Sequence, residues 1–504
     1  MWGSALQAKV VMAKLFPKLV SFLAVLLLLC QFGYVVCQST NPSDRNATLP
    51  PDEANALQDL LTTLGWFSPV SSFCSSDFQG IKCNCTSDNN NSTVCHVTGL
   101  DLSNRKLDGQ INATALTSLV YLKTIDLSNN QLDGSIPVTM GNLPSLNYLD
   151  LSNNQLDGII LVTMGNLSAL RYLDLSYNQL NGSIPVTMRN LPALRYLDLS
   201  NNQLDGSIPV TMGNLLRYLR LSTNFLSGSI PPLLGNLSSL EYLSLKYNML
   251  SGEIPKELGK LSNLQEMYLG FNELTGQLPP ELGRLGSLYA LDVGSNNLSG
   301  ELPENYANFS TLDQLRWFSV AGNRLTGQVP RFIANWTGLS FLFLSGNDFE
   351  GELPLEPLFN MSYLRILFVS DVRSSAGFPF PKNASMTGIR YLVIRNCSIS
   401  GEIPPYIGNW SSLTYLDLSF NSLTGGIPDS MKKLKLSKMF LTGNMLSGPV
   451  PSWVPDNIED KADLSYNNFE IPRDGPKKGE RKRNMNSIRD LTDKCQGKPK
   501  CKLY

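Results

Sequence analysis

The stretch that decides the fold is a motif that recurs four times: IDLSNNQLDGSIP from Ile125, LDLSNNQLDGII from Leu149, LDLSYNQLNGSIP from Leu173 and LDLSNNQLDGSIP from Leu197. Successive copies begin 24 residues apart. The full unit has the form LxxLxLxxNxLxGxIPxxLGNLxx. A fixed period of this length is typical of solenoids, in which each repeat packs chiefly against its neighbours.

The L-x-L of each unit places two leucines on the same side of a short strand, because strand side chains alternate between faces. We therefore expect a right-handed α/β solenoid with a leucine core and a parallel sheet on its concave face. The Gly-x-Ile-Pro that follows, as at Gly134–Pro137, favours a turn and a short extended segment. The GNLxxL stretch is expected to form a short helical turn on the convex side.

An asparagine recurs three residues after the second apolar position of each strand. A polar residue fixed beside buried leucines needs hydrogen bonds, and an asparagine amide supplies both donors and an acceptor to the backbone where each coil bends. We interpret these asparagines as structural residues, not catalytic ones. They are Asn130, Asn154, Asn178, Asn202, Asn224, Asn248, Asn272, Asn296, Asn323, Asn347, Asn421 and Asn444.

The repeat resembles the leucine-rich repeat of plant receptor-like kinases and of polygalacturonase-inhibiting proteins, over about three quarters of the chain. The segments DEANALQDLLTTLGW at Asp52–Trp66 and VIRNCSISGEIP at Val393–Pro404 are similar to the receptor-kinase group that carries a malectin-like domain. That resemblance implies an extracellular recognition module without the malectin-like, transmembrane and kinase regions of such relatives.

The ends of the chain predict its route and its domains. Lys9, Lys14 and Lys18 precede the apolar run Leu19–Val36, which is typical of a signal peptide; an uncleaved membrane anchor is the alternative. We expect a secreted or plasma-membrane-associated protein on the extracellular side. The expected domains are a signal peptide (1–37), an N-terminal cap (38–96), a leucine-rich-repeat solenoid (97–470) and a basic tail, disordered in solution (471–504).

Cysteines and glycosylation motifs agree with a secretory route. Four cysteines crowd before the first repeat, at Cys74, Cys83, Cys85 and Cys95, and predict two disulfides with three connectivities open; a zinc site with His96 is the alternative. N-linked glycans are expected at fourteen N-x-S/T motifs. Their acceptors are Asn46, Asn84, Asn91, Asn112, Asn166, Asn181, Asn236, Asn297, Asn308, Asn335, Asn360, Asn383, Asn396 and Asn409.

Several classes of function are disfavoured. A formal net charge of -1 gives no global electrostatic reason to bind nucleic acid. A kinase catalytic loop needs His-Arg-Asp, whereas the one histidine, His96, is followed by Val97 and Thr98. We therefore expect no kinase activity in this chain, no catalytic residues, no metal and no cofactor. The repeated Asp126, Asp150, Asp174 and Asp198 are interpreted as a solvated acidic stripe.

Ligand specificity is expected where the repeat pattern breaks. In the strand position that the four aspartates occupy, later repeats carry Arg220, Ser244, Tyr268, Asp292, Ser319, Phe343, Phe368 and Val393. Because these positions alternate with the core leucines, an aromatic cluster there predicts exposed apolar area and a binding face, although packing along the strands is the alternative. The expected ligand-contact residues are Arg220, Lys246, Tyr247, Tyr268, Phe271, Trp317, Phe341, Phe343, Phe368 and Tyr391.

The segment Asp371–Met386 is interpreted as an inserted loop beside that face. The sequence thus predicts an extracellular module that binds a peptide, a glycan or a partner receptor on its concave face, with a membrane co-receptor as a possible second partner. The alternative is a soluble inhibitor of cell-wall hydrolases.

Overall fold

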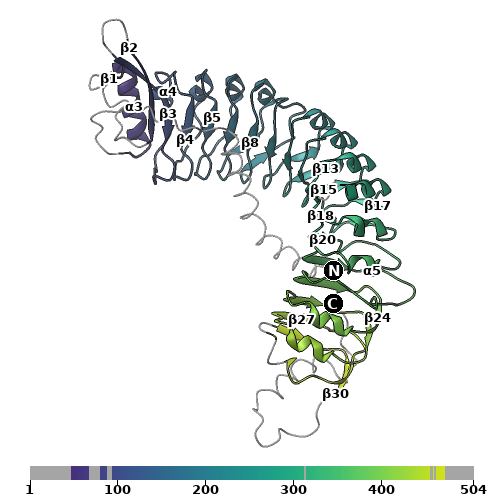
Figure 1. Ribbon diagram of the computed structural model, residues 1–504. Coiled ribbons are helices and arrows are strands. Elements are labelled where there is room, and N and C mark those ends of the chain that lie inside the picture. The colour runs from purple at the N-terminus through teal and green to yellow at the C-terminus, as the bar shows by residue number, and fades with distance from the viewer. Residues whose placement is uncertain are drawn as a thin grey trace, which may run out of the picture.

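The computed structural model describes residues 47–66, 80–87, 93–311, 314–454, 458 and 461–470. The expected signal peptide and basic tail lie outside these residues. The described chain forms a curved solenoid, with the main strands along the inner side of the arc and the short helices along the outer side (Figure 1). In this part of the chain, no helix is both long enough and apolar enough to cross a bilayer.

The main sheet has 18 strands, and neighbouring coils pair in parallel except for the antiparallel pair β2–β3. Each strand is short because the chain turns out of the sheet after the L-x-L triplet. The strands are β1 (Ala47–Thr48), β2 (Ile81–Ser87), β3 (Thr93–Asp101), β4 (Thr124–Asp126), β5 (Tyr148–Asp150), β6 (Tyr172–Asp174), β8 (Tyr196–Asp198), β10 (Tyr218–Arg220), β12 (Tyr242–Ser244), β14 (Glu266–Tyr268), β16 (Ala290–Asp292), β18 (Trp317–Ser319), β20 (Phe341–Phe343), β21 (Ile366–Ser370), β23 (Tyr391–Arg395), β25 (Tyr415–Asp417), β27 (Lys438–Phe440) and β29 (Lys461–Asp463).

A second series of parallel strands follows the first turn of many coils, at the Leu-x-Gly-x segment. Gly134 illustrates why glycine stands there, since its φ of 70° is in the left-handed region. These strands are β7 (Asn181–Ser183), β9 (Gln203–Asp205), β11 (Ser227–Ser229), β13 (Met249–Glu253), β15 (Glu273–Thr275), β17 (Ser299–Gly300), β19 (Arg324–Leu325), β22 (Phe378–Pro379), β24 (Ile399–Glu402), β26 (Ser422–Thr424), β28 (Ser447–Pro449) and β30 (Asn468–Glu470).

Short helices complete the outer side of the coils. In most coils the helical turn starts directly after the proline, so it lies a few residues earlier than the GNLxxL stretch in which we expected it. The 3-10 helices are η1 (Val138–Asn142), η2 (Val162–Asn166), η3 (Val186–Asn190), η4 (Pro232–Asn236), η5 (Lys256–Lys260), η6 (Pro280–Arg284), η7 (Glu304–Thr311), η8 (Arg331–Asn335), η9 (Pro405–Asn409) and η10 (Asp429–Lys433), and the α-helices are α3 (Pro51–Thr63), α4 (Ala113–Leu116) and α5 (Leu355–Leu358).

One leucine-rich core runs through the described solenoid from Ala56 to Phe469. Helix α3 covers its first coil, because Leu57, Leu60 and Leu61 are buried in the same core as Val97 of β3. Glu53 of α3 is 5% exposed and accepts a hydrogen bond from the Val97 amide at 3.0 Å. The cap therefore keeps the first leucines from water, as a terminal repeat requires.

The expected asparagine ladder is confirmed. The amide nitrogen of Asn178 donates to the carbonyls of Leu151, Leu175 and Ser176 at 3.0, 3.2 and 3.2 Å, and its oxygen accepts from the Leu156 amide at 3.0 Å. One side chain thus satisfies backbone groups of two successive coils. The ladder is interrupted at Val372 and Cys397, where the buried thiol of Cys397 lies 3.1 Å from the Arg395 carbonyl and replaces the amide donor.

The interpretation of Asp371–Met386 as a loop beside the concave face is wrong. Strands β21 and β23 pair over five residues without a register shift, and Phe378, Phe380 and Met386 are buried in the leucine core. Leu367 and Leu392 are register partners 25 residues apart, so the segment is one ordinary coil with a weaker consensus. Its strand β22 pairs with β24 in the second series.

The cysteines of the cap agree in part with the prediction. Cys85 and Cys95 face each other across β2 and β3 and form a disulfide, and Cys83 is also disulfide-bonded. Cys74 lies outside the described residues. A zinc site built on this cluster is wrong, because thiolates that are joined in a disulfide cannot ligate a metal.

We expect the cysteines to differ sharply in chemical labelling. In the native secreted protein, an alkylating reagent should miss Cys83, Cys85 and Cys95 because they are oxidised, and Cys397 because it is buried. Unfolding without a reductant should expose Cys397 alone among these four, as read by peptide mass mapping. Alkylation of Cys85 and Cys95 in the unreduced protein would contradict the disulfide.

Candidate ligand-binding surface

The expected alignment of side chains across the concave sheet is confirmed. Parallel pairing places Asp198 beside Arg220, Arg220 beside Ser244, and Ser244 beside Tyr268. The same column continues through Asp292, Ser319, Phe343, Phe368 and Val393. The 24-residue period therefore brings residues that are far apart in sequence onto one line of the sheet.

A second apolar cluster lies on this face, separate from the leucine core. Trp317 contacts Phe341 and Phe343, with ring centroids 5.1 and 4.8 Å apart, and Phe343 meets the edge of Phe368 at 5.3 Å. We name it the concave aromatic cluster. Its buried members are Tyr268, Ala290, Trp317, Phe343, Ile366 and Phe368, and Tyr242, Ala321, Phe341, Tyr391 and Val393 are partly buried against them.

The prediction that these aromatics are exposed is wrong for four of them. Trp317 is 5% exposed, Phe343 and Tyr268 are each 3% exposed, and Phe368 is 8% exposed. Neighbouring strands lie about 5 Å apart on a concave surface, so large side chains in register cover one another. The half-buried members of the expected site are Arg220, Lys246, Tyr247, Phe271, Phe341 and Tyr391.

Two cations mark the N-terminal end of this cluster. The Arg220 guanidinium lies 3.3 Å from an Asp198 carboxylate oxygen and 5.3 Å from the centre of the Tyr242 ring. The Lys246 ammonium lies 5.3 Å from the Tyr268 ring and 5.6 Å from the Tyr247 ring. Burial lowers the pKa of Lys246, although the nearby Asp292 opposes this effect. A cation held between aromatic rings suits recognition of a ligand that combines an apolar group with an anionic one.

Tyr247 and Phe271 lie at the turns that follow strands β12 and β14. Both have φ near +60°, at 58° and 59°, as do the residues at this position in other coils, which include Asn129, Tyr177 and Phe420. The rings of Tyr247 and Phe271 stack at 4.3 Å. The left-handed backbone is therefore a regular feature of the repeat, and the stacked rings are the feature of this pair that bears on binding. The signal that could have found this pair is the aromatic residue before the ladder asparagine in two successive repeats.

The interpretation of the aspartates as a solvated stripe is also wrong. Asp150, Asp174 and Asp198 are 8%, 7% and 2% exposed, and each accepts hydrogen bonds from the amide and hydroxyl of the serine two residues later. The tyrosines beside them cover them, since the rings of Tyr148 and Tyr172 stack at 4.4 Å. These carboxylates are thus part of the folded structure and are not a water-exposed surface.

Burial changes the acidity of this column. Desolvation, opposed by the Ser152 hydrogen bonds and reinforced by Asp126, raises the pKa of Asp150 to about 6. Desolvation and the neighbouring Asp198 and Asp150 raise the pKa of Asp174 well above its ordinary value. The Asp198 carboxylate lies 3.3 Å from the Arg220 guanidinium. Asp150 and Asp174 therefore keep their protons at pH values at which an exposed aspartate is already ionised.

The expected glycan acceptors lie mainly away from the concave face. Asn166, Asn236, Asn335 and Asn409 are exposed and end the helices η2, η4, η8 and η9 on the outer side. Asn396 is exposed at the end of β23 and donates to Asp371 at 2.8 Å. The other acceptors in the described residues are exposed or half-buried, and Asn46 and Asn91 lie outside them.

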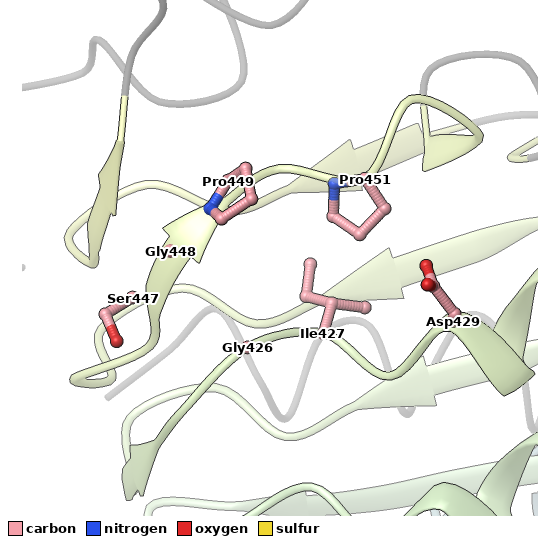
Figure 2. Close-up of a pocket in the computed structure, with 7 residues that line it drawn as sticks. All are labelled: Gly426, Ile427, Asp429, Ser447, Gly448, Pro449 and Pro451. Carbon is pink, nitrogen blue, oxygen red and sulfur yellow. The ribbon is translucent and has the colours of Figure 1, made fainter.

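A pocket of about 430 Å³ opens far from the concave aromatic cluster, between the last coils. Figure 2 shows Pro449 and Pro451 on one side of it, with Ile427 and Asp429 on the other. Apart from the Asp429 carboxylate and the Ser447 hydroxyl, the lining consists of glycines, prolines and an isoleucine, which offer little chemistry. In the described part of the chain, no three His, Cys, Asp or Glu side chains are placed to hold a metal ion.

Comparison with known families identifies the repeat. Residues 154–345 match a leucine-rich repeat region, residues 95–156 match a leucine rich repeat, and residues 388–410 and 412–434 match a leucine rich repeat as well. A probable LRR receptor-like serine/threonine-protein kinase of Arabidopsis thaliana is 47% identical over 96 residues, which are 19% of this chain and 9% of the relative. Receptor-like protein 35 of the same plant is 35% identical over 138 residues, 26% of this chain and 14% of the relative.

The chain thus spans only about a tenth of the length of these curated relatives. Solved structures match over much more of it. The TDR receptor is 30% identical with a TM-score of 0.65, over 73% of this chain and 68% of that one. The Arabidopsis receptor kinase HAESA, in complex with the peptide hormone IDA and the co-receptor SERK1, is 27% identical with a TM-score of 0.64, over 84% of each chain.

A third structure, the plant peptide hormone receptor RGFR1 in complex with RGF2, is 28% identical with a TM-score of 0.62, over 75% of this chain and 67% of that one. These similarities extend along most of the solenoid and agree with the repeat observed here. The chain therefore belongs to the leucine-rich-repeat family and is homologous to plant leucine-rich-repeat receptor-like kinases and receptor ectodomains.

Proposed function

We propose that this chain is an extracellular recognition module that binds a peptide on its concave face, and that a membrane co-receptor converts binding into a signal. The chain itself carries out no catalysis in this proposal. The observation that carries it is the concave aromatic cluster with Arg220 and Lys246 at its end. Similarity to RGFR1 and HAESA, whose structures contain peptide hormones, favours a peptide over the other ligands considered.

The half-buried side chains define where the peptide would lie. Phe341 and Tyr391 flank the buried Trp317 and Phe343, while Tyr247 and Phe271 stack at the turn that follows the strands. Aromatic anchors with a charged rim are the composition of binding hot spots. Glycans on the outer helices would leave this face open. An extended peptide could therefore contact one coil after another from Arg220 towards Tyr391.

We expect Phe341→Ala and Tyr247→Ala each to weaken peptide binding at least about tenfold, roughly 1.4 kcal/mol, because each removes a ring that a bound peptide would cover. The probes would be peptides selected on the unmodified protein from a random-sequence display library. Dissociation constants would be measured by calorimetry, with a melting curve for each variant. Because both side chains lie on the concave side, we expect each substitution to weaken the binding of all the selected peptides.

Phe225→Ala is the matched control, because Phe225 is 54% exposed and precedes β11, which belongs to the second series of strands and not to the main sheet. It should leave peptide binding unchanged. Equal losses for Phe225→Ala, or full binding by both concave variants, would overturn the placement of the site. Inhibition of a pectin hydrolase by a chain that selects no peptides would favour the inhibitor alternative.

A further inference from the structure

A row of Asp-Gly pairs lies on one flank of the nearly identical N-terminal coils, between the ladder asparagine of each coil and its Ile-Pro segment. The pairs are Asp133–Gly134, Asp157–Gly158 and Asp205–Gly206. The three aspartates are exposed, and the three glycines have φ of 70°, 72° and 69°. We name these three pairs the Asp-Gly row.

The fold does not need an aspartate at these positions. Later coils carry serine or threonine before the same glycine, at Ser227, Ser251 and Thr275, and there they form the regular strands β11, β13 and β15. None of the ion pairs in the described part of the chain involves an aspartate of the Asp-Gly row. The stability of the coil therefore gives no reason for aspartate in this row.

An aspartate that precedes glycine is chemically reactive, because glycine has no Cβ to keep its backbone nitrogen away from the preceding side chain. The glycine nitrogen adds to the aspartate Cγ, and its proton leaves with a carboxyl hydroxyl as one water molecule, which closes a succinimide ring. Water then opens the ring. Cleavage between nitrogen and Cγ restores aspartate, whereas cleavage between nitrogen and the main-chain carbonyl carbon gives isoaspartate, in which the backbone runs through Cβ and Cγ.

The glycine amides of the Asp-Gly row are available for this step. Gly134, Gly158 and Gly206 lie outside the named strands, and within the described residues none of their amides donates a hydrogen bond. Their carbonyl groups, in contrast, each accept from the next coil. The donors are the amides of Asp157, Asn181 and Ser227, at 2.9, 2.8 and 2.8 Å.

Two related pairs are held by their surroundings. Asn181–Gly182 lies inside β7, which pairs with β9, and Asn181 is an expected glycan acceptor. Asp108–Gly109 lies against α3, because the Thr63 carbonyl leaves no room for even a Cβ on Gly109 and accepts from the Gln110 amide at 2.8 Å. Closing the succinimide ring requires the peptide between the two residues to rotate, and these contacts oppose that rotation.

We propose that the Asp-Gly row is a modification site, at which isoaspartate forms spontaneously as the protein ages. Each isoaspartate adds one methylene group to the main chain. At Asp157 the added group falls between two hydrogen bonds that join neighbouring coils, from the Asp157 amide to Gly134 and from the Asn181 amide to Gly158. A modified coil cannot keep both bonds in their present geometry, so its stability falls. This inference does not rest on the proposed peptide site.

The test follows the whole secreted protein through several weeks at physiological temperature and neutral pH. Peptide mapping with electron-transfer fragmentation distinguishes isoaspartate from aspartate at each position. We expect isoaspartate to accumulate at all three positions of the Asp-Gly row, to several times the level at Asp108. Mapping by peptide also separates the contribution of Asp474–Gly475, which lies outside the described residues.

The triple variant Asp133→Ser, Asp157→Ser and Asp205→Ser carries the residue that later coils use, so its melting temperature before incubation should match that of the unmodified protein. After incubation, the unmodified protein should melt at a lower temperature and the serine variant should not. The matched control replaces the exposed Gln131, Gln155 and Gln203, two residues earlier, by serine. It should form isoaspartate in the Asp-Gly row as the unmodified protein does.

Three results would overturn the proposal. One is the absence of isoaspartate from all three positions of the row after incubation. Another is equal accumulation at Asp108, since contact with α3 would then have no protective effect. The third is an equal loss of melting temperature in the aged serine variant, because the loss would then arise elsewhere in the chain.

Discussion

Asp150→Asn should make the stability of this protein less dependent on pH and should stabilise it in neutral solution. Burial raises the pKa of Asp150 from 3.8 to about 6, so the folded state holds its proton more tightly than the unfolded state does. The free energy of unfolding therefore falls as the pH rises from about 4 through about 6, by roughly 3 kcal/mol for this residue. About half of that loss falls between roughly pH 5 and pH 7.5.

The amide is a close substitute for the protonated acid. Its oxygen can accept the same hydrogen bonds that Asp150 accepts from the Ser152 amide and hydroxyl, at 2.9 and 2.7 Å. Urea unfolding at several pH values would measure the difference between variant and unmodified protein. Asp157→Asn, which removes an exposed carboxylate from the same coil, is the control and should keep the original pH dependence. A parallel pH dependence in Asp150→Asn would contradict the raised pKa of the buried Asp150 carboxyl.

Asn178→Ala should lower the free energy of unfolding by roughly 1–3 kcal/mol. The substitution removes the partners of the Leu156 amide and of the Leu151 and Leu175 carbonyls, which lie between two coils. A buried backbone group that loses its hydrogen-bond partner still bears the full cost of its desolvation. The alanine methyl group cannot replace the lost hydrogen bonds. Denaturant midpoints and the slope of the transition would measure the effect.

Gln179→Ala is the control for this experiment, because Gln179 is the exposed neighbour of Asn178. It should change stability little. Asn178→Asp keeps the oxygen acceptor but loses the three donor contacts, so its stability should lie between those of the alanine variant and the unmodified protein. Identical melting of Asn178→Ala and the unmodified protein would contradict the structural role of the ladder.

Most of the architecture could be predicted from the sequence, because in a solenoid the repeat length determines which residues of neighbouring strands pair. Once Leu149, Leu173 and Leu197 are aligned, Tyr268 and Phe343 necessarily fall in the column of the aspartates. The segment Asp371–Met386 was misjudged because its consensus is weak there. The structure closes that coil with Phe378 and Met386 in place of leucines.

The candidate site was predicted in position but not in exposure. Alternation along a strand predicts which side chains point away from the leucine core, and Trp317, Phe343 and Tyr268 do point away from it. Whether such side chains meet water depends on their neighbours on the adjacent coils. Here adjacent rings on a concave surface converge, so most of the aromatic area is covered by other aromatics. The same effect buries Asp150 and Asp174 beneath the tyrosine stack.

The sequence by itself determined the repeat, the leucine core, the asparagine ladder and the face on which unusual residues gather, since each follows from local alternation and a 24-residue period. Only the tertiary structure decided which of those residues are accessible and that burial raises the pKa of Asp150 and Asp174. These properties depend on distances between coils and on desolvation. Such quantities arise only when neighbouring coils stack.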